Sequence, residues 1–350
     1  AGLAALLVGS LWAAPVAPAA PPRATARAAG LGVGAPAAIL VQRDVHRTLF
    51  ARNSDERRPI ASTTKLMTAW VAVHHARPSD VLTVQPYAAG PGESLSGVAP
   101  GERLTLADLL RAMLLPSGND IAHTLAVDLG GGSPERFIGW MNDAARRLGM
   151  FNSHFSTPIG LDRPGNYSSA ADLERLADAV LGQPLLASVV GQRSARLADG
   201  RVVVNRNDLL FARPWIVGLK TGNTAEAGEC LVGAARRDGT TVISVVLGEP
   251  TVAARDADSL TLLRAGLAAY RAERPVRTGV VYARVPVLGR PGERVRLFAA
   301  RPLTLFVAAA STARTTVTLR DVPASASGPL PAGAALGQID VHRGGRIVAR

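Results

Sequence analysis

Cysteine and lysine are the scarcest reactive residues of this sequence. It contains one cysteine, Cys230, which leaves no partner for an internal disulfide. Cys230 stands in an apolar stretch, which favours a small core residue over a nucleophile. The six histidines show no metal-ligand spacing. We therefore expect neither a metal ion nor another cofactor.

Lysine occurs twice, at Lys65 and Lys220, and arginine supplies the other 37 of the 39 basic side chains. Arginine keeps its proton in proteins, whereas a buried lysine can lose it and act as a base. The two positions that retain lysine are therefore candidates for chemistry that arginine cannot perform.

Ser62 and Lys65 stand three residues apart at the start of a helix predicted over residues 63–76. On a helix this spacing places the hydroxyl and the amine on one face. A serine is a weak nucleophile until a neighbouring base takes its proton, and a desolvated lysine can be that base. Lowering the lysine pKa to near neutrality would cost roughly 4 kcal/mol, which burial and one nearby cation can supply. Alone, the pattern fits a capping serine and a surface lysine better.

Length and composition fit two folded domains. The chain has 350 residues, of which 47% are hydrophobic and 19% charged. Residues 36–272 are predicted to form strands, helices, strands again and a closing helix. This order indicates a sheet built from both ends of the region, with helices between them. Residues 273–350 show short alternating runs between Gly and Pro, which predict a separate small all-β domain.

The first 20 residues contain an apolar run followed by small residues and prolines, as in a secretory signal or anchor. A Pro/Ala-rich linker is predicted to follow, up to residue 35. The apolar run is short for a membrane-spanning helix. We therefore expect export to an extracytoplasmic location, in the cell wall or on the outer face of the cytoplasmic membrane.

Positive charge is concentrated near the C-terminus. Residues 271–350 hold 13 arginines and four acidic residues, which amounts to +9 of the formal net charge of +12. This density predicts that the accessory domain, residues 273–350, attracts an anionic wall polymer or a membrane surface. Export argues against nucleic acid. The alternative is a solvated arginine-rich strand face without a dedicated partner.

Two further motifs give the first one a chemical context. Ser117-Gly118-Asn119 follows a predicted helix, and Lys220-Thr221-Gly222 follows a predicted strand. Together with Ser62-Thr63-Thr64-Lys65 they stand in the order of a set that marks β-lactamases and penicillin-binding proteins. Each motif is weak alone. Their order, and the presence of both lysines inside them, point to acyl transfer.

The catalytic residues predicted from these motifs are Ser62, Lys65 and Ser117. Ser62 would attack, Lys65 would take its proton, and Ser117 would pass a proton to the leaving amine. The backbone N–H groups of Ser62 and Asn223 would form the oxyanion hole, because one lies at a helix start and the other just past a glycine.

The predicted substrate-binding residues flank this group. Asn119 would hold the amide of the substrate. Lys220 would add positive potential and, with Thr221, bind a terminal carboxylate. Gly222 would leave room for the substrate to lie along the strand as an added β partner, with Asn223 directly after it.

On these motifs the chain resembles the low-molecular-mass penicillin-binding proteins that are D-alanyl-D-alanine carboxypeptidases. The resemblance covers residues 36–272 well and residues 273–350 more loosely. Further landmarks that carry it are Pro100-Gly101-Glu102, Gly160-Leu161-Asp162 and Tyr167-Ser168-Ser169-Ala170. It implies an α/β fold like that of serine β-lactamases and penicillin-binding proteins, with an antiparallel sheet, a helical region and a small C-terminal all-β domain.

The resemblance also implies a function. It implies a serine carboxypeptidase that removes the terminal D-alanine from peptidoglycan stem pentapeptides through an acyl-enzyme on Ser62 and that is inhibited by β-lactam antibiotics. Two positions depart from the family pattern: Ile159 replaces an expected histidine, and Asn223 stands where histidine or another polar residue is frequent.

Two other functions fit some of the motifs. A β-lactamase needs a second general base, usually a loop glutamate between the second and third motifs. Glu135 and Glu174 are the glutamates in that interval, and both fall in predicted helices. A non-catalytic wall-binding protein would keep the fold, but the intact catalytic residues argue against it.

Overall fold

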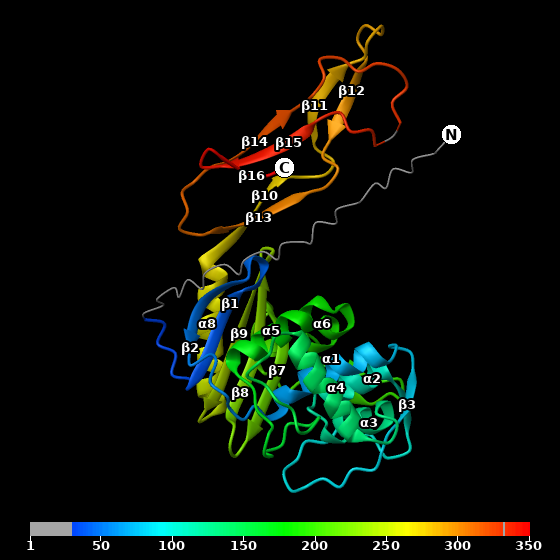
Figure 1. Ribbon diagram of the computed structural model, residues 1–350, viewed down its shortest axis with the longest axis vertical. Coiled ribbons are helices and arrows are strands. Elements are labelled where there is room, and N and C mark those ends of the chain that lie inside the picture. The colour runs from blue at the N-terminus through cyan, green and yellow to red at the C-terminus, as the bar shows by residue number, and fades with distance from the viewer. Residues whose placement is uncertain (1–29, 332) are drawn as a thin grey trace, which may run out of the picture.

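An antiparallel sheet of five strands forms the centre of the structure, a computed structural model that describes residues 30–331 and 333–350. The strand order is β2–β1–β9–β8–β7, so strands from both ends of the region meet in one sheet, as the sequence predicts (Figure 1). The strands are β1 (Ala37–Gln42), β2 (Arg47–Arg52), β7 (Ile216–Thr224), β8 (Gly228–Arg237) and β9 (Thr240–Glu249).

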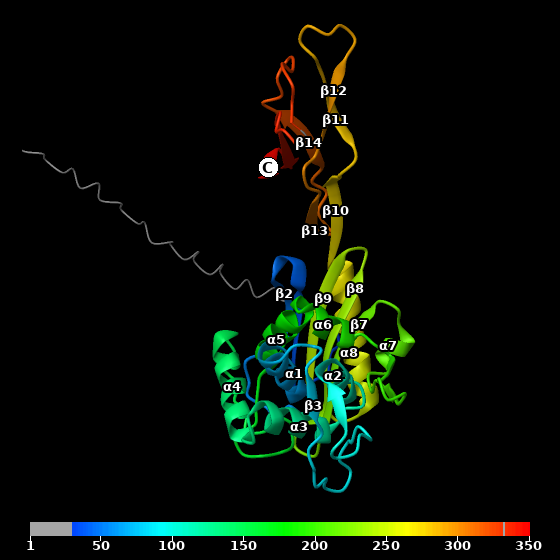
Figure 2. The ribbon, with the colours of Figure 1, turned by 90° about the vertical axis from the view of Figure 1, so that its right-hand side faces the viewer.

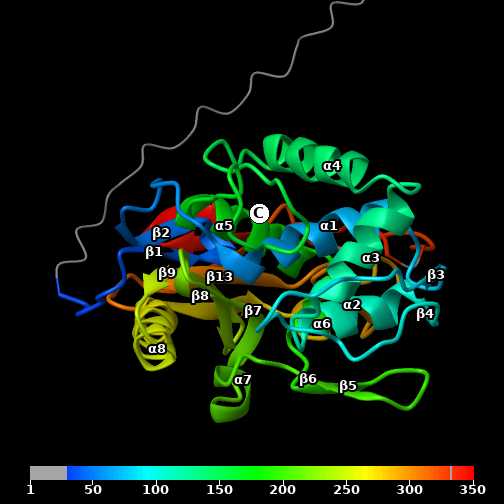
Figure 3. The ribbon, with the colours of Figure 1, turned by 90° about the horizontal axis from the view of Figure 1, so that it is seen from below.

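Helices cover both faces of this sheet. Helix α8 lies on one face, and α1, α4 and α5 lie on the other (Figure 3). The helical elements are η1 (Arg43–Val45), η2 (Ala61–Thr64), α1 (Lys65–His75), α2 (Leu106–Leu114), α3 (Asn119–Leu129), α4 (Pro134–Arg147), α5 (Ala170–Gly182), α6 (Pro184–Val190), α7 (Leu209–Ala212) and α8 (Val252–Ala269).

The starts of three helices follow from their capping residues. Thr105, Ser133 and Ser169 each accept a hydrogen bond from the backbone N–H three residues further on, which stabilises the first turn of α2, α4 and α5. Sequence reading missed α6 and α7. Helix α6 begins with Pro184 but has a glutamine cap, Gln183, and spans only 7 residues, and α7 is a single turn, so both are too short to show a clear helical period.

The sheet separates two hydrophobic cores. Alternate side chains of β9 point to opposite faces, as the period of a strand requires. Val242 and Val246 pack with α8, whereas Ile243, Val245 and Leu247 pack with the helical region. Both faces of the central strands are therefore buried, which explains the long apolar runs in their sequences.

The C-terminal residues form further strands, as predicted. These strands lie beyond the end of α8, away from the five-stranded sheet (Figure 2). They pair as β10 (Tyr270–Val276) with β13 (Leu303–Ala308), β11 (Val281–Pro286) with β12 (Arg294–Phe298), and β14 (Thr315–Arg320) with β15 (Gln338–Arg343) and β16 (Arg346–Ala349). β10 begins directly after α8, close to the boundary predicted at residue 272.

Two small two-stranded sheets lie outside the central sheet. They pair β3 (Val81–Thr83) with β4 (Arg103–Thr105), which a long loop connects, and β5 (Ser194–Arg196) with β6 (Val202–Val204), which form a hairpin. The predicted signal-like segment and residues 21–29 of the linker lie outside the described residues. Packing against the core begins at Leu31, before Pro36. Asp258 of α8 holds this segment by accepting hydrogen bonds from the backbone N–H groups of Gly34 and Ala35. Among the residues described, no helix combines the length and apolarity needed to cross a membrane.

The core under α8 provides a stability test. Leu263 is fully buried between α8 and the sheet. We predict that Leu263→Ala lowers the free energy of unfolding by about 2–5 kcal/mol, because it leaves a cavity. Val252→Ala, at an exposed position of the same helix, should change it by less than about 0.5 kcal/mol. Urea denaturation measures both; equal effects would contradict this account of the core.

Candidate active site

Ser62 and Lys65 meet where η2 runs into α1. Their Oγ and Nζ atoms are 2.8 Å apart. Lys65 is fully buried, whereas Ser62 stays partly exposed. The three-residue spacing therefore brings the amine of Lys65 into contact with the hydroxyl of the partly exposed Ser62, as the sequence predicts. Lys65 is not the surface lysine of the alternative interpretation.

Two more oxygen atoms surround the amine of Lys65. Nζ lies 2.7 Å from Oδ1 of Asn119 and 2.8 Å from the carbonyl oxygen of Ile159. Both can only accept hydrogen bonds, whereas the hydroxyl of Ser62 can also donate. A neutral amine has two N–H groups and one lone pair. The arrangement thus satisfies a neutral Lys65 whose lone pair faces Ser62.

Electrostatics favour this neutral form. Burial and the nearby charge of Lys220 lower the pKa of Lys65 well below its usual value, and Arg206 adds to the effect. Glu93 and Asp120 act in the opposite direction and raise the pKa of Lys65. The lowering influences dominate, so Lys65 is suited to accept a proton.

The second motif is held between α2 and α3. Ser117 is buried and has a left-handed backbone with φ of 69°, a conformation that costs a non-glycine residue about 1–3 kcal/mol and often marks functional sites. Gly118 has no room for a side chain, because a Cβ would lie 2.7 Å from the carbonyl oxygen of Ala112. Asn119 opens α3 and contacts Lys65. The first two motifs therefore meet in space.

The third motif lies on β7, at one edge of the sheet. Lys220 is buried, and its Nζ donates to the carbonyl oxygen of Thr221 at 3.0 Å. A Cβ on Gly222 would lie 3.0 Å from the carbonyl oxygen of Ile60 and 3.1 Å from the backbone nitrogen of Ser62. Gly222 thus packs directly against the residue that carries the hydroxyl. Asn223, one residue on, is exposed and donates to Glu229 at 2.6 Å.

Positive charge surrounds Lys220. Burial, Arg206 and Arg255 lower its pKa to about 7. Arg206 donates to Oγ of Ser94 at 2.7 Å, and the buried Arg255 pairs with Glu229 at 2.8 Å. These cations make the surroundings of Lys220 on β7 favourable for an anionic group such as a carboxylate.

Among the described residues, no cluster of three or more His, Cys, Asp or Glu side chains could hold a metal ion.

Three residues contribute to the site in ways that were not predicted from the sequence. The carbonyl oxygen of Ile159 contacts Lys65 through the backbone, so the departure from histidine at this position leaves that contact intact. Gly160 has φ of 96°, and a Cβ there would lie 2.0 Å from the carbonyl oxygen of Ala61. Glu93 accepts a hydrogen bond from Nδ2 of Asn119 at 2.7 Å. Glu93 lies on the loop between β3 and β4, in which the sequence shows no catalytic motif.

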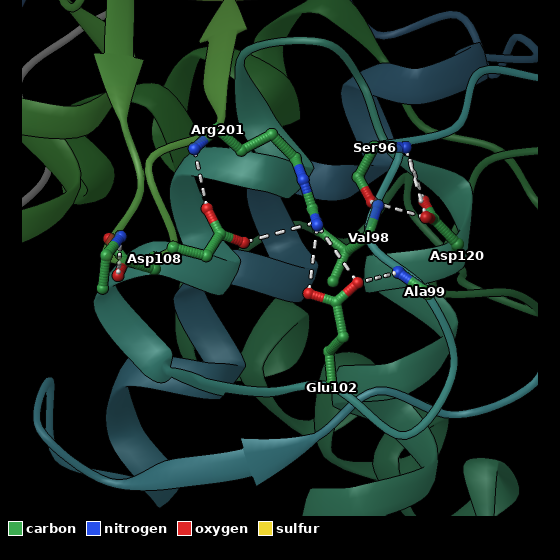
Figure 4. A network of polar contacts seen from close by, with 9 residues as sticks. Ser96, Val98, Ala99, Glu102, Asp108, Asp120 and Arg201 are labelled. Carbon is green, nitrogen blue, oxygen red and sulfur yellow. Dashed lines mark hydrogen bonds and ion pairs between the residues drawn. The ribbon is translucent and has the colours of Figure 1, made fainter.

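A polar network holds that loop in place (Figure 4). Asp120 accepts hydrogen bonds from the backbone N–H and the hydroxyl of Ser96, at 3.0 and 2.5 Å. Glu102 accepts from the backbone N–H of Ala99 at 2.7 Å and pairs with Arg201 at 3.1 Å. The loop is therefore tied both to α3 and to the β5–β6 hairpin.

Comparison with known proteins identifies the family. A family model described as D-alanyl-D-alanine carboxypeptidase matches residues 23–251. The chain belongs to this family. The match spans all three motifs, as the resemblance seen in the sequence implies.

Individual members of the D-alanyl-D-alanine carboxypeptidase family agree in sequence and structure. The carboxypeptidase DacF of Bacillus subtilis is 28% identical over 335 residues, which cover 92% of this chain and 85% of that protein. The crystal structure of the Streptomyces K15 DD-transpeptidase matches with a TM-score of 0.63 and 31% identity, over 67% of this chain and 98% of that one. The crystal structure of the carboxypeptidase DacD of Francisella tularensis matches with a TM-score of 0.67 and 25% identity, over 91% of both chains. This last likeness extends into the C-terminal strands.

The close packing of Gly222 generates a prediction. We expect Gly222→Ala to lower the rate of Ser62 acylation by a β-lactam by about 100-fold, because the new Cβ displaces the backbone at Ser62 by a fraction of an ångström. Gly139→Ala, on α4 where the added Cβ meets nothing within 4 Å, should leave the rate unchanged. Stopped-flow acylation with a fluorescent penicillin measures both. A wild-type rate in Gly222→Ala would refute this role.

Proposed function

We infer that this chain is a serine D,D-carboxypeptidase that removes the terminal D-alanine from peptidoglycan stem pentapeptides. The observation that carries this inference is the 2.8 Å contact between the partly exposed Ser62 and the buried Lys65. Family membership supplies the substrate class. The same serine is expected to be acylated by β-lactam antibiotics, which carry a reactive amide beside a carboxylate.

The first step forms the acyl-enzyme. Oγ of Ser62 attacks the carbonyl carbon of the penultimate D-alanine while its proton passes to Nζ of Lys65. The carbonyl oxygen becomes an oxyanion, and we assign its stabilisation to the backbone N–H groups of Ser62 and Asn223. The close approach of Gly222 to the nitrogen of Ser62 supports this assignment, because it brings the end of β7 beside the nucleophile.

The second step releases the products. The C–N bond breaks, and the proton held by Lys65 passes through the hydroxyl of Ser117 to the leaving D-alanine amine. Ser117 suits this role because it lies two residues before Asn119, whose side chain contacts Nζ of Lys65. Water then attacks the ester, and its proton returns through Lys65 to Ser62. The shortened peptide leaves with a new terminal carboxylate.

Substrate binding is assigned to the edge of the sheet. β7 pairs with β8 on one side, and we propose that the stem peptide lies along its other edge as an added strand. Lys220 and Thr221 would bind the terminal carboxylate, which the cations around Lys220 favour. Asn119 would hold the substrate amide through its remaining N–H. Gly222 and Asn223 would line the groove.

The β-lactamase alternative finds no support in the site. Glu135 and Glu174 lie in α4 and α5, as predicted, and not in a loop. Glu135 contacts the cap of its own helix, because the hydroxyl of Ser133 donates to it. The intact constellation around Lys65 also argues against a purely non-catalytic wall-binding role.

Intact-protein mass spectrometry after benzylpenicillin treatment tests the function. We predict a lasting adduct of one whole drug molecule, because ring opening adds the drug without a leaving group. Ser62→Ala should lose the adduct. Lys65→Arg, which keeps the charge but cannot act as a base, should acylate about 10²–10⁴-fold more slowly. Rapid drug turnover without an adduct would indicate a β-lactamase, and no reaction would refute the proposed enzyme.

We propose further that the enzyme acts outside the cytoplasm and that residues 273–350 form a basic accessory domain facing an anionic wall polymer or membrane surface. Arg284 and Arg296 lie directly opposite each other on β11 and β12, and both are exposed. Arg294 lies two residues from Arg296, on the same face. Opposed like charges destabilise a hairpin, so an anionic partner would relieve their repulsion.

The three arginines allow a direct test. We predict that replacing Arg284, Arg294 and Arg296 with Gln lowers binding to phosphatidylglycerol vesicles or to purified anionic wall polymer by at least tenfold at low salt. The two preparations distinguish the membrane from the wall. A matched triple replacement of the exposed Arg47, Arg103 and Arg147 should have little effect. Equal losses in both variants, or none, would contradict a dedicated surface.

A further inference from the structure

Glu93 is a carboxylate in direct contact with the second motif. Its Oε2 accepts hydrogen bonds from Nδ2 of Asn119, at 2.7 Å, and from the hydroxyl of Tyr87. Its Oε1 accepts from the backbone N–H of Gly90 at 2.9 Å. The carboxylate is half-buried and held on three sides. The proposed mechanism gives Glu93 no role.

These contacts determine which way the amide of Asn119 points. An ionised carboxylate can only accept hydrogen bonds, so it takes the NH₂ end of the amide. The oxygen end then faces Nζ of Lys65, at 2.7 Å. A flipped Asn119 would present N–H groups to an amine that already needs acceptors, and would remove one of the oxygens around Lys65. Glu93 therefore selects the orientation in which Lys65 keeps its lone pair for Ser62.

Glu93 also affects Lys65 through its charge. The charged groups that face Lys65 come from four elements: Lys220 on β7, Arg206 before α7, Asp120 on α3 and Glu93 on the loop. Burial alone would raise the pKa of Glu93. The hydrogen bonds from Tyr87, Asn119 and Gly90, together with the charge of Lys65, hold this pKa below its usual value. Glu93 is thus ionised at neutral pH. Its negative charge raises the pKa of Lys65, against the lowering by Lys220 and Arg206.

We propose that Glu93 is a positioning residue for the acylation of Ser62, which fixes the amide of Asn119 and keeps a negative charge beside Lys65. This rests on the proposed function, in which Lys65 is the base. Glu93 itself contacts neither the nucleophile nor the base. Its influence passes through Asn119 and through its charge.

The matched control for Glu93 is Glu102. Both are carboxylates of the same loop, and both anchor it through a backbone N–H, of Gly90 and of Ala99 respectively. Glu102 pairs with Arg201 and is not among the groups that affect Lys65. Glu93→Gln and Glu102→Gln thus remove the same charge from the same loop, but only the first removes it beside Lys65.

The experiment measures the second-order rate of acylation by benzylpenicillin as a function of pH, for the wild type and each variant. The rate rises with pH as Lys65 loses its proton, and the midpoint of this rise reports the pKa of the free enzyme. Loss of the negative charge lowers the pKa of Lys65. We therefore expect the midpoint in Glu93→Gln to move to lower pH by about half a unit or more, and the midpoint in Glu102→Gln to stay at the wild-type value.

The maximal acylation rate at high pH tests the orientation of Asn119. Gln at position 93 can still accept from Nδ2, so its maximal rate should fall less than tenfold, whereas Glu93→Ala should lose about 10–100-fold. Thermal denaturation checks that the variants fold; if the alanine variant does not, the shift in Glu93→Gln decides. Unshifted midpoints in Glu93→Gln would overturn the proposal. A wild-type protein that forms no adduct would instead refute the proposed function.

Discussion

The burial of one amine governs the arrangement of this site. Lys65 is fully buried, and a buried ammonium without a paired carboxylate is expensive. Burial and the charge of Lys220 favour a neutral amine. The surrounding oxygens of Asn119 and Ile159 satisfy its two N–H groups, while its lone pair faces the oxygen of Ser62. Each of these oxygens comes from a different part of the chain. The packing of three segments around Lys65 thus creates both its lowered pKa and its contact with Ser62.

The rest of the fold positions these segments against one another. Residues 60–62 are enclosed between Gly222 of β7 and Gly160; a side chain on Gly160 is excluded, and one on Gly222 would require the neighbouring backbone to shift. The central sheet fixes β7, and the helical core fixes α1 and α3. The hydroxyl of Ser62 therefore lies where a sheet edge, a helix start and a glycine turn converge. Such a point offers backbone N–H groups, a hydroxyl and an open strand edge within a few ångströms.

Much of this site could be predicted from the sequence, because its decisive contact is local. Ser62 and Lys65 are three residues apart on a helical segment. The contacts of Lys65 with Ile159 and of Asn119 with Glu93 could not be predicted, because they join residues 94 and 26 positions apart. Ile159 moreover acts through its backbone, which leaves no trace in residue type. Helices α6 and α7 were missed because both are too short to show a clear helical period.

The distribution of amines has a practical consequence. Both lysines of the chain are buried in one site, and the other basic side chains are guanidinium groups. Among the described residues, no lysine amine is exposed to a reagent that modifies side-chain amines. Acetylation or amine cross-linking of Lys65 or Lys220 would therefore require this site to open, and its rate would measure local unfolding there.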